Sequence, residues 1–282
     1  MMTDVSDLSL LLGHPSSRGL IVTFVLVLGL LIGSFLNVVI YRLPRRESLW
    51  KPGSHCPACQ HSIRWFENIP LVSFILLKGK CGGCAQPISP RYPLVELLTG
   101  LLFLAAYLFK GWSWVLWIRD IPFLALMIVV TFIDLDHRII PDRLNLLGVL
   151  LGLLTAALDP HLGVTGSLLG ALGGFGIFYG FAWLYWSMTA RSGLGGGDIK
   201  FLAVLGAFLG LTGVFTVILL SSVLGSALGL LLGWTQKKSG ETESVLKVAL
   251  PYGPFLVIGA LVAYFFQESL AEILWLPFMN PM

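Results

Sequence analysis

Charged residues are scarce in this sequence. Only 12% of the 282 residues are Asp, Glu, Lys or Arg, whereas a soluble domain has about 25%. Because 56% of the residues are apolar, this scarcity excludes a water-soluble globule. Polar low-complexity tracts are also lacking, which excludes a disordered chain. The net charge of +3 gives no indication of a nucleic-acid partner, and we expect none.

The sequence contains long runs of apolar residues. Runs near 20 residues recur along the chain, and the alternating pattern of barrel strands does not. We therefore predict an all-α polytopic membrane protein of about eight transmembrane helices with a small cytoplasmic zinc-ribbon-like loop domain. The runs are Gly19 to Tyr41, 93–109, 113–135, 143–158, 163–188, 199–210, 212–234 and 248–267. The first run lacks a signal-peptide cleavage site, so we expect a retained helix.

The polar residues divide the chain into three parts. We expect an N-terminal tail and first transmembrane helix in 1–41, a cytoplasmic tetracysteine loop domain in 42–92, and a multi-helix membrane domain in 93–282. Within the loop, the run Ile69 to Leu77 has too few residues to span a bilayer, so it should pack in the loop domain or lie at the membrane interface. Glycines within 166–180 and 221–233 should let helices approach closely.

Basic residues predict the orientation. If the loop after the first helix is cytoplasmic, 15 of the 18 Lys and Arg residues fall inside, and Arg18, Lys110 and Arg119 remain outside. This distribution agrees with the positive-inside rule, and it places both termini outside the cytoplasm.

The chain has only four cysteines, and all lie in the loop. They form two C-x-x-C pairs, Cys56 with Cys59 and Cys81 with Cys84. Two such pairs can complete a tetrahedral Zn²⁺ site, which would be structural because no coordination position stays open. Iron in a rubredoxin-like site is an alternative, and disulfides become one if the orientation is inverted. His55 or His61 could replace a cysteine, although we expect both to be solvated.

Carboxylates inside apolar runs are costly and usually functional. Asp134, Asp136 and Asp142 cluster at the end of the third run, and Asp198 follows Gly195-Gly196-Gly197 at the start of the sixth, on the same side of the membrane. Two carboxylates held close together cannot both stay ionised, so one keeps a proton while the other activates water. The alternatives are purely structural roles: ordinary charges at helix ends, a helix cap at Asp198 or Asp142, and an ion pair of Asp134 with Arg138.

Other hydrolytic machinery is not recognisable. Only five histidines are present, and no H-E-x-x-H or local Ser-His-Asp pattern occurs. The glycine run before Asp198 could unwind and accept an extended peptide. The residues therefore favour an aspartic peptidase mechanism, so we expect 93–282 to be a multi-helix membrane aspartic protease domain.

Several motifs together resemble one protein family. They are Gly33-Ser-Phe-Leu-Asn-Val-Val-Ile-Tyr-Arg-Leu-Pro44, the paired C-x-x-C loop, Pro90-Arg-Tyr-Pro93 with Glu96, Ile133-Asp134 to Pro141-Asp142, Gly195-x-Gly-Asp198-x-Lys200 and Pro251-Tyr-Gly-Pro254. In order and spacing they resemble the bacterial type IV prepilin peptidases of pilus assembly and type II secretion.

The resemblance implies a bifunctional enzyme of the bacterial inner membrane. Such an enzyme cleaves the leader of prepilins and pseudopilins after a Gly on the cytoplasmic side, and methylates the new N-terminus, usually Phe, with S-adenosylmethionine. By resemblance the catalytic residues are Asp134 and Asp198, and we expect Gly195, Gly197, Lys200 and Arg138 to support them. No nucleotide-binding fold is recognisable in the sequence for the methyl donor, and Asn37 and Glu96 are the candidates for its site. Glu47, Glu67 and Glu96 are candidate contacts for the basic leader.

Other functions stay open on the sequence. A Gly-x-Gly-Asp intramembrane protease without methyl transfer is the main alternative. An ion-coupled transporter would need paired helix interruptions in two repeated halves, which we do not find. A membrane anchor for a pilus machine is a third alternative. The sequence does not indicate an oligomeric state.

Overall fold

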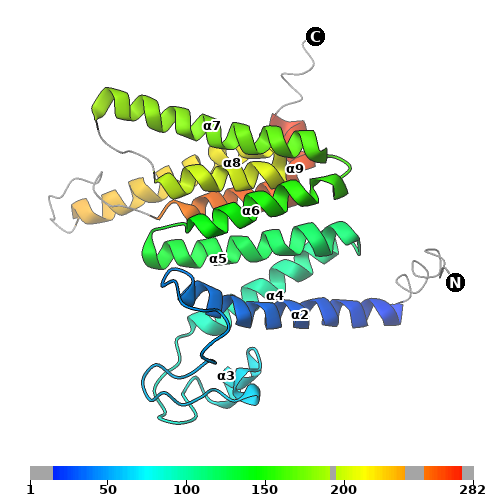
Figure 1. The fold of residues 1–282 in the computed structure, drawn as a ribbon, viewed down its shortest axis with the longest axis vertical. Helices are drawn as coiled ribbons and strands as arrows, with labels where there is room; N and C mark the ends of the chain where they lie inside the picture. Colours follow the sequence, from blue (N-terminus) through cyan, green and yellow to red (C-terminus); the bar gives the residue numbers. More distant parts are fainter. Residues whose placement is uncertain (1–14, 191–194, 239–250, 275–282) are drawn as a thin grey trace. The chain divides into compact units, whose positions relative to one another are not determined.

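The computed structural model describes residues 15–190, 195–238 and 251–274, and their regular elements are helices (Figure 1). Two isolated β-bridges are the extended pairings in this part of the chain. The all-helical prediction is confirmed. The helices are α2 (Pro15–Arg42), α3 (Val72–Leu76), α4 (Arg91–Lys110), α5 (Ile121–His137), α6 (Asp142–Thr155), α7 (Gly163–Thr189), α8 (Gly196–Lys238) and α9 (Gly253–Leu274), with single turns at Trp65–Asn68, Leu116–Asp120 and Ala156–Leu158.

Five helical stretches in the described residues are long and apolar enough to cross a membrane. They are Arg18–Arg42, Arg91–Lys110, Leu116–His137, Gly163–Thr189 and Gly196–Leu231. The stretch Gly253–Phe266 of α9 is a shorter apolar helix, and α6 has 14 residues. The eight predicted runs all fall on these helices, because two of the runs share α8. The last helix begins at Gly253 rather than at 248, and residues 248–250 lie outside the described part.

Gly210 divides α8 into two halves. Its φ of 69° and ψ of −177° are not helical, and the positive φ is accessible to glycine. A Cβ atom on Gly174 of α7 would touch the Leu202 carbonyl oxygen and lie 3.3 Å from Val214 Cγ2. In a continuous helix these two residues would be about 18 Å apart. The chain therefore turns back at Gly210, between the predicted runs 199–210 and 212–234.

The chain forms two compact units, and the first comprises Met1–Ile128. In this unit α2 packs against α4. A Cβ atom on Gly29 would lie 2.7 Å from Gly100 Cα, and one on Gly33 would lie 2.7 Å from Glu96 Cα. The glycines thus allow close backbone contact in a membrane, where packing rather than the hydrophobic effect holds helices together.

The run 113–135 contains Arg119 and Asp120, which are charged residues inside a predicted span. Both lie in the π-helical turn Leu116–Asp120, and they are 2% and 4% exposed. The Asp120 carboxylate lies 3.4 Å from Lys110 Nζ. This ion pair offsets the cost of a buried charge.

The second unit comprises Val129–Met282 and is built around α8. Figure 1 shows α7, α8 and α9 running side by side, and α6 also contacts α8. A Cβ atom on Gly170 or Gly206 would collide with the backbone of the facing helix, α8 or α7 respectively. Gly176, Gly180 and Gly229 meet nothing within 4 Å, so only part of the predicted glycine stretches mediates helix packing.

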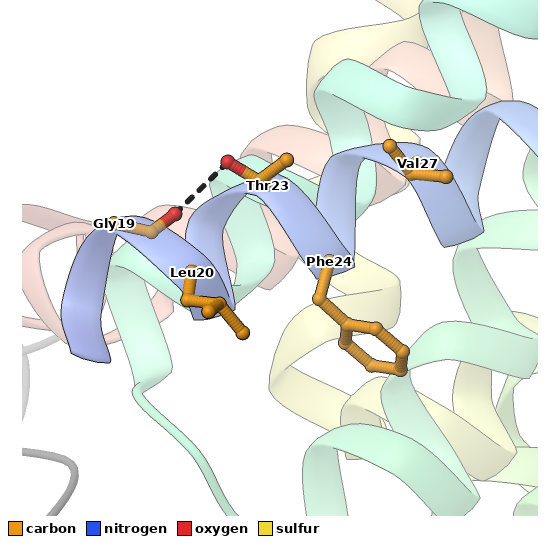
Figure 2. A pocket seen from close by; sticks show the side chains of 5 residues that line it. All are labelled: Gly19, Leu20, Thr23, Phe24 and Val27. Atoms are coloured by element: carbon orange, nitrogen blue, oxygen red, sulfur yellow. Dashed lines mark hydrogen bonds between the residues drawn. The ribbon is translucent and has the colours of Figure 1, made fainter. Parts of the chain in front are cut away.

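A shallow hollow lies on the first turns of α2 (Figure 2). Its lining consists of Gly19, Leu20, Thr23, Phe24 and Val27, and the Thr23 hydroxyl donates to the Gly19 carbonyl at 2.9 Å. The lining has no ionisable group and no free hydroxyl donor. The hollow therefore offers no acid, base or nucleophile for chemistry.

Candidate functional site

The cysteine loop is built from two knuckles of the same geometry. In the first, the Cys56 N–H donates to the His61 carbonyl at 2.9 Å, and in the second the Cys81 N–H donates to the Gln86 carbonyl at 2.8 Å. Gln60 and Ala85, each four residues after the first cysteine of its pair, have φ values of 60° and 58°. The local sequence thus folds each C-x-x-C pair into a tight turn that directs both sulfurs to one point.

The four sulfurs fit a tetrahedral metal site. All four lie within 4.8 Å of one another, and the Cys56–Cys84 and Cys59–Cys81 Sγ–Sγ distances are 3.9 Å. Zn–S bonds of about 2.3 Å in a tetrahedron require sulfurs about 3.8 Å apart. The cysteines are unbonded thiols, so the disulfide alternative does not describe this structure. The cluster could hold a metal.

The electrostatics of the cluster also favour a bound cation. Backbone N–H groups of Cys59 and Ala58 lower the pKa of Cys56 to about 7. Those of Cys84 and Gly83 lower the pKa of Cys81. The His61 N–H also lowers the pKa of Cys59, but the neighbouring thiols and burial outweigh it and raise this pKa to about 12. Four adjacent thiolates repel one another unless a metal ion compensates their charge.

The histidines near the cluster have other partners. His61 Nε2 lies 3.1 Å from a Glu67 carboxylate oxygen, and His55 Nδ1 lies 3.0 Å from the Gly53 carbonyl. The Arg64 N–H donates to Glu67 at 2.9 Å, and this bond together with His61 lowers the pKa of Glu67. Glu67 therefore acts within the loop as the partner of His61 and Arg64.

Asp134 lies in the last turn of α5 and is 4% exposed. The Gly253 N–H, at the start of α9, donates to Asp134 Oδ2 at 2.8 Å. The other carboxylate oxygen, Oδ1, has no hydrogen-bond partner among the described residues. One oxygen is thus fixed by the backbone, and the second is available.

Asp198 lies in the first turn of α8 and is partly buried. It is the third residue of the helix, so it does not occupy the cap position considered from the sequence. A Cβ atom on Gly195 would lie 2.7 Å from Asp198 Oδ2, and one on Gly197 would lie 3.2 Å from the Ile140 backbone nitrogen. Asn145 of α6 donates from Nδ2 to the Gly197 carbonyl at 3.4 Å. The glycines let this turn pack tightly beside the end of α5.

The two carboxylates belong to the same unit, where the turn that carries Asp198 packs through Gly197 against Ile140, six residues after Asp134. Ile133 and Ile199, their neighbours along the chain, and Ile140 beside Gly197 are apolar and buried. A pair of carboxylates in such surroundings can share a proton, which gives one acid and one base. This arrangement suits metal-free hydrolysis of an amide bond.

The other acidic candidates occupy different places. Asp136 is exposed on the last turn of α5. Asp142 begins α6 as its first helical residue, with Pro141 as the cap, and is likewise exposed. Its carboxylate lies 2.7 Å from Lys200 Nζ. Lys200 therefore pairs with Asp142 in the described structure.

Arg138 does not form the ion pair considered from its spacing to Asp134. Its φ of 53° ends α5, and its N–H donates to the Asp134 carbonyl at 2.8 Å. Because the residue leaves the helical conformation, its side chain is not one turn above Asp134. No ion pair between the two occurs among the described residues.

The two candidate residues for a methyl-donor site, Asn37 and Glu96, already have hydrogen-bond partners in the first unit. The buried Glu96 accepts the Leu71 N–H at 2.9 Å, and the buried Asn37 donates to the Tyr92 carbonyl at 3.1 Å. Glu47, a candidate leader contact, is exposed. Glu96 thus holds the loop segment before α3 to α4.

Sequence reasoning missed two residues near the carboxylates. Gly253 was noted only as part of a motif, and Asn145 is a lone amide in an apolar run. The structure singles out Asn145 because the residue is only 4% exposed and its Oδ1 atom has no hydrogen-bond partner among the described residues. No local pattern links Gly253 to Asp134, which is 119 residues away.

Comparisons with known proteins identify the family. The model of the Bacterial Peptidase A24 N-terminal domain matches residues 27–109, and that of the Type IV leader peptidase family matches residues 121–230. The chain is similar to proteins named prepilin leader peptidase/N-methyltransferase. One from Myxococcus xanthus is 44% identical over 82% of this chain and 70% of the relative, and one from Xanthomonas campestris is 36% identical over 93% and 94%.

A third relative of the same name, from Neisseria gonorrhoeae, is 40% identical over 71% of this chain and 78% of the relative. No solved structure gives a significant match. The apolar helices together with these matches describe a multi-pass bacterial membrane protein. The chain belongs to the type IV leader peptidase family.

Proposed function

We propose that this chain cleaves the leader peptides of type IV prepilins and pseudopilins with Asp134 and Asp198 as catalytic residues, and then methylates the new N-terminus. Family membership assigns both activities, because the matched relatives are named for both. The observation that carries the catalytic assignment is a buried carboxylate at the end of α5, with a second carboxylate in a turn of α8 that packs against the segment just after α5.

Cleavage follows from the proton that the two carboxylates share. The ionised carboxylate takes a proton from a water molecule, and the resulting hydroxide attacks the carbonyl carbon of the leader glycine. The protonated carboxyl gives its proton to the carbonyl oxygen, which yields a neutral tetrahedral diol. A proton then moves from a carboxyl to the amide nitrogen, a hydroxyl of the diol returns its proton to a carboxylate, and the C–N bond breaks. The products are a carboxylic acid and a free amine.

Methyl transfer takes S-adenosylmethionine as the donor, as the name of the relatives implies. The methyl group passes to the new N-terminal amine, usually that of Phe. The names of the matched relatives favour this bifunctional enzyme over a Gly-x-Gly-Asp protease without methyl transfer.

The metal of the cysteine loop is zinc in this proposal. The sulfur spacing of 3.9 Å agrees with tetrahedral Zn–S geometry, and four thiolate ligands leave no open position. The metal therefore stabilises the loop and takes no part in cleavage. Iron would fit the same four sulfurs, so metal analysis decides between them.

The enzyme lies in the bacterial inner membrane with its carboxylates toward the cytoplasm. The support for this orientation is the 15 to 3 distribution of basic residues. A reduced compartment also agrees with four free thiols in the loop.

Purified protein with a synthetic prepilin tests the catalytic assignment. Asp134→Asn and Asp198→Asn keep side-chain size but cannot cycle a proton, so each should lower cleavage by about 10³-fold or more. Both variants should still methylate a precut substrate with a free N-terminal Phe, which shows that they are folded. Asp136→Asn and Asp142→Asn are the matched controls and should retain cleavage.

Each contrary result has a defined meaning. Full cleavage by Asp134→Asn with an inactive Asp142→Asn would move the first carboxylate to Asp142. Full cleavage by Asp198→Asn would refute the aspartic mechanism. Cleavage without methylation by the unchanged protein would favour the protease-only alternative.

A further inference from the structure

The start of α9 meets the carboxylate of Asp134. The Tyr252 carbonyl accepts the N–H groups of Phe255 and Leu256 at 3.1 and 3.2 Å, which makes Tyr252 the cap of the helix. Gly253 is the first helical residue, so its own N–H has no acceptor inside the helix. Pro254, the next residue, has no N–H at all. Gly253 is therefore the donor that this helix start offers to Asp134.

The Gly253 N–H reaches Asp134 because glycine has no side chain. A Cβ atom at this position would lie 2.7 Å from Asp134 Oδ2, 3.0 Å from Cγ and 3.1 Å from Cβ. Oδ2 and Cγ belong to a short side chain that can rotate away, whereas the contact with the Asp134 Cβ at 3.1 Å asks the two segments to separate by a few tenths of an ångström. Alanine at this position would thus displace the carboxylate rather than unfold the helix.

A second contact anchors the same turn to α8. The Tyr252 hydroxyl lies 2.9 Å from the Ser221 hydroxyl, and Ser221 is fully buried. Farther along α9, a Cβ atom on Gly259 would lie 3.0 Å from the Val217 carbonyl oxygen. The donor is therefore part of a packed pair of helices.

We propose that Gly253 is a positioning residue for cleavage: its N–H fixes Oδ2 of Asp134, so that Oδ1 is the oxygen presented to water and to the scissile bond. This inference rests on the proposed function of Asp134. It deepens that function, because it places the start of α9 in the active site without making Gly253 a catalytic residue.

Gly253→Ala tests the proposal in the full-length membrane protein. A displacement near 1 Å costs a reaction on the order of 10²-fold, so kcat for prepilin cleavage should fall by about that factor while KM changes little. Methylation of a precut substrate should be unchanged. The control is Gly259→Ala on the same helix, which should lower the melting temperature and leave kcat of the folded protein unchanged.

The outcomes separate the two claims. Full cleavage by Gly253→Ala, or a loss seen only in KM, would overturn the positioning role while the inactivity of Asp134→Asn still supports the proposed function. Failure of the unchanged protein to cleave prepilin would overturn the proposed function itself. If Gly253→Ala does not fold, replacing the Tyr252–Gly253 amide by an ester removes the N–H, adds no side chain and only weakens the Tyr252 carbonyl as an acceptor, and this variant should show the same loss of kcat.

Discussion

At the scale of single residues, the glycines of the second unit differ in what a side chain would meet. A Cβ atom on Gly253 or Gly195 would touch a carboxylate, whereas one on Gly206 would touch the backbone of α7. A Cβ atom on Gly196 or Gly229 would meet nothing within 4 Å. Replacing glycine by alanine should therefore affect cleavage at Gly253 and Gly195. It should affect stability at Gly206, and neither property at Gly196 and Gly229.

Gly195→Ala should slow cleavage while the fold is kept. Its Cβ atom would lie 2.7 Å from Asp198 Oδ2, and the carboxylate is the group that can move. We expect a loss of kcat on the order of 10²-fold, measured with a synthetic prepilin, and an unchanged melting temperature. The neighbouring Gly196→Ala is the matched control, and it should retain cleavage. Equal activity of the two variants would contradict this reading of the glycine motif.

At the scale of elements, α7 and α8 depend on two small residues. A Cβ atom on Gly206 would collide with the Gly170 carbonyl. Gly206→Ala should therefore destabilise the protein by about 1–3 kcal/mol, as overpacking does, measured by unfolding in detergent or lipid. Gly229→Ala, in the second half of the same helix, should be neutral or slightly stabilising because alanine favours a helix. A destabilisation of equal size at both positions would argue against the close α7–α8 contact.

The cysteine loop is an element that depends on its metal. Its single helix α3 has no buried residue, so apolar packing contributes little to its stability. Arg42 ties the loop to the end of α2 by donating to the Ser48 and Pro52 carbonyls at 2.9 and 2.7 Å.

Metal analysis should give about one zinc per chain. Chelation or Cys81→Ser should make the loop sensitive to protease. His61→Ala should retain the metal, since its ring contacts Glu67. An intact, protease-resistant loop in a metal-free preparation would refute the structural role.

At the scale of the whole molecule, the distribution of charge predicts the orientation. A cysteine introduced at His161, an exposed residue between α6 and α7, should react with an impermeant thiol label applied outside. One introduced at Ser239, which lies outside the described residues, should be protected until the membrane is opened. The reverse pattern would invert the predicted topology.

The sequence determined the class and the chemistry of this protein. Low charge and recurring apolar runs require helices in a membrane, because every backbone polar group must be paired there. The C-x-x-C spacing sufficed for the sulfur cluster, since each knuckle is local and closes within six residues. The positions of Asp134 and Asp198 at helix ends were also readable, because apolar periodicity stops where these residues occur.

Only the tertiary structure decided which groups surround those carboxylates. The Gly253 N–H reaches Asp134 over 119 residues, and Asn145 reaches the Gly197 carbonyl over 52. Lys200 forms an ion pair with Asp142. Arg138 has a positive φ at the end of α5, so the helical spacing that suggested an ion pair with Asp134 does not apply to it. Sequence patterns report neighbours one or two turns away along a helix. Contacts between helix ends depend on how the helices pack, and a one-turn shift would replace every partner.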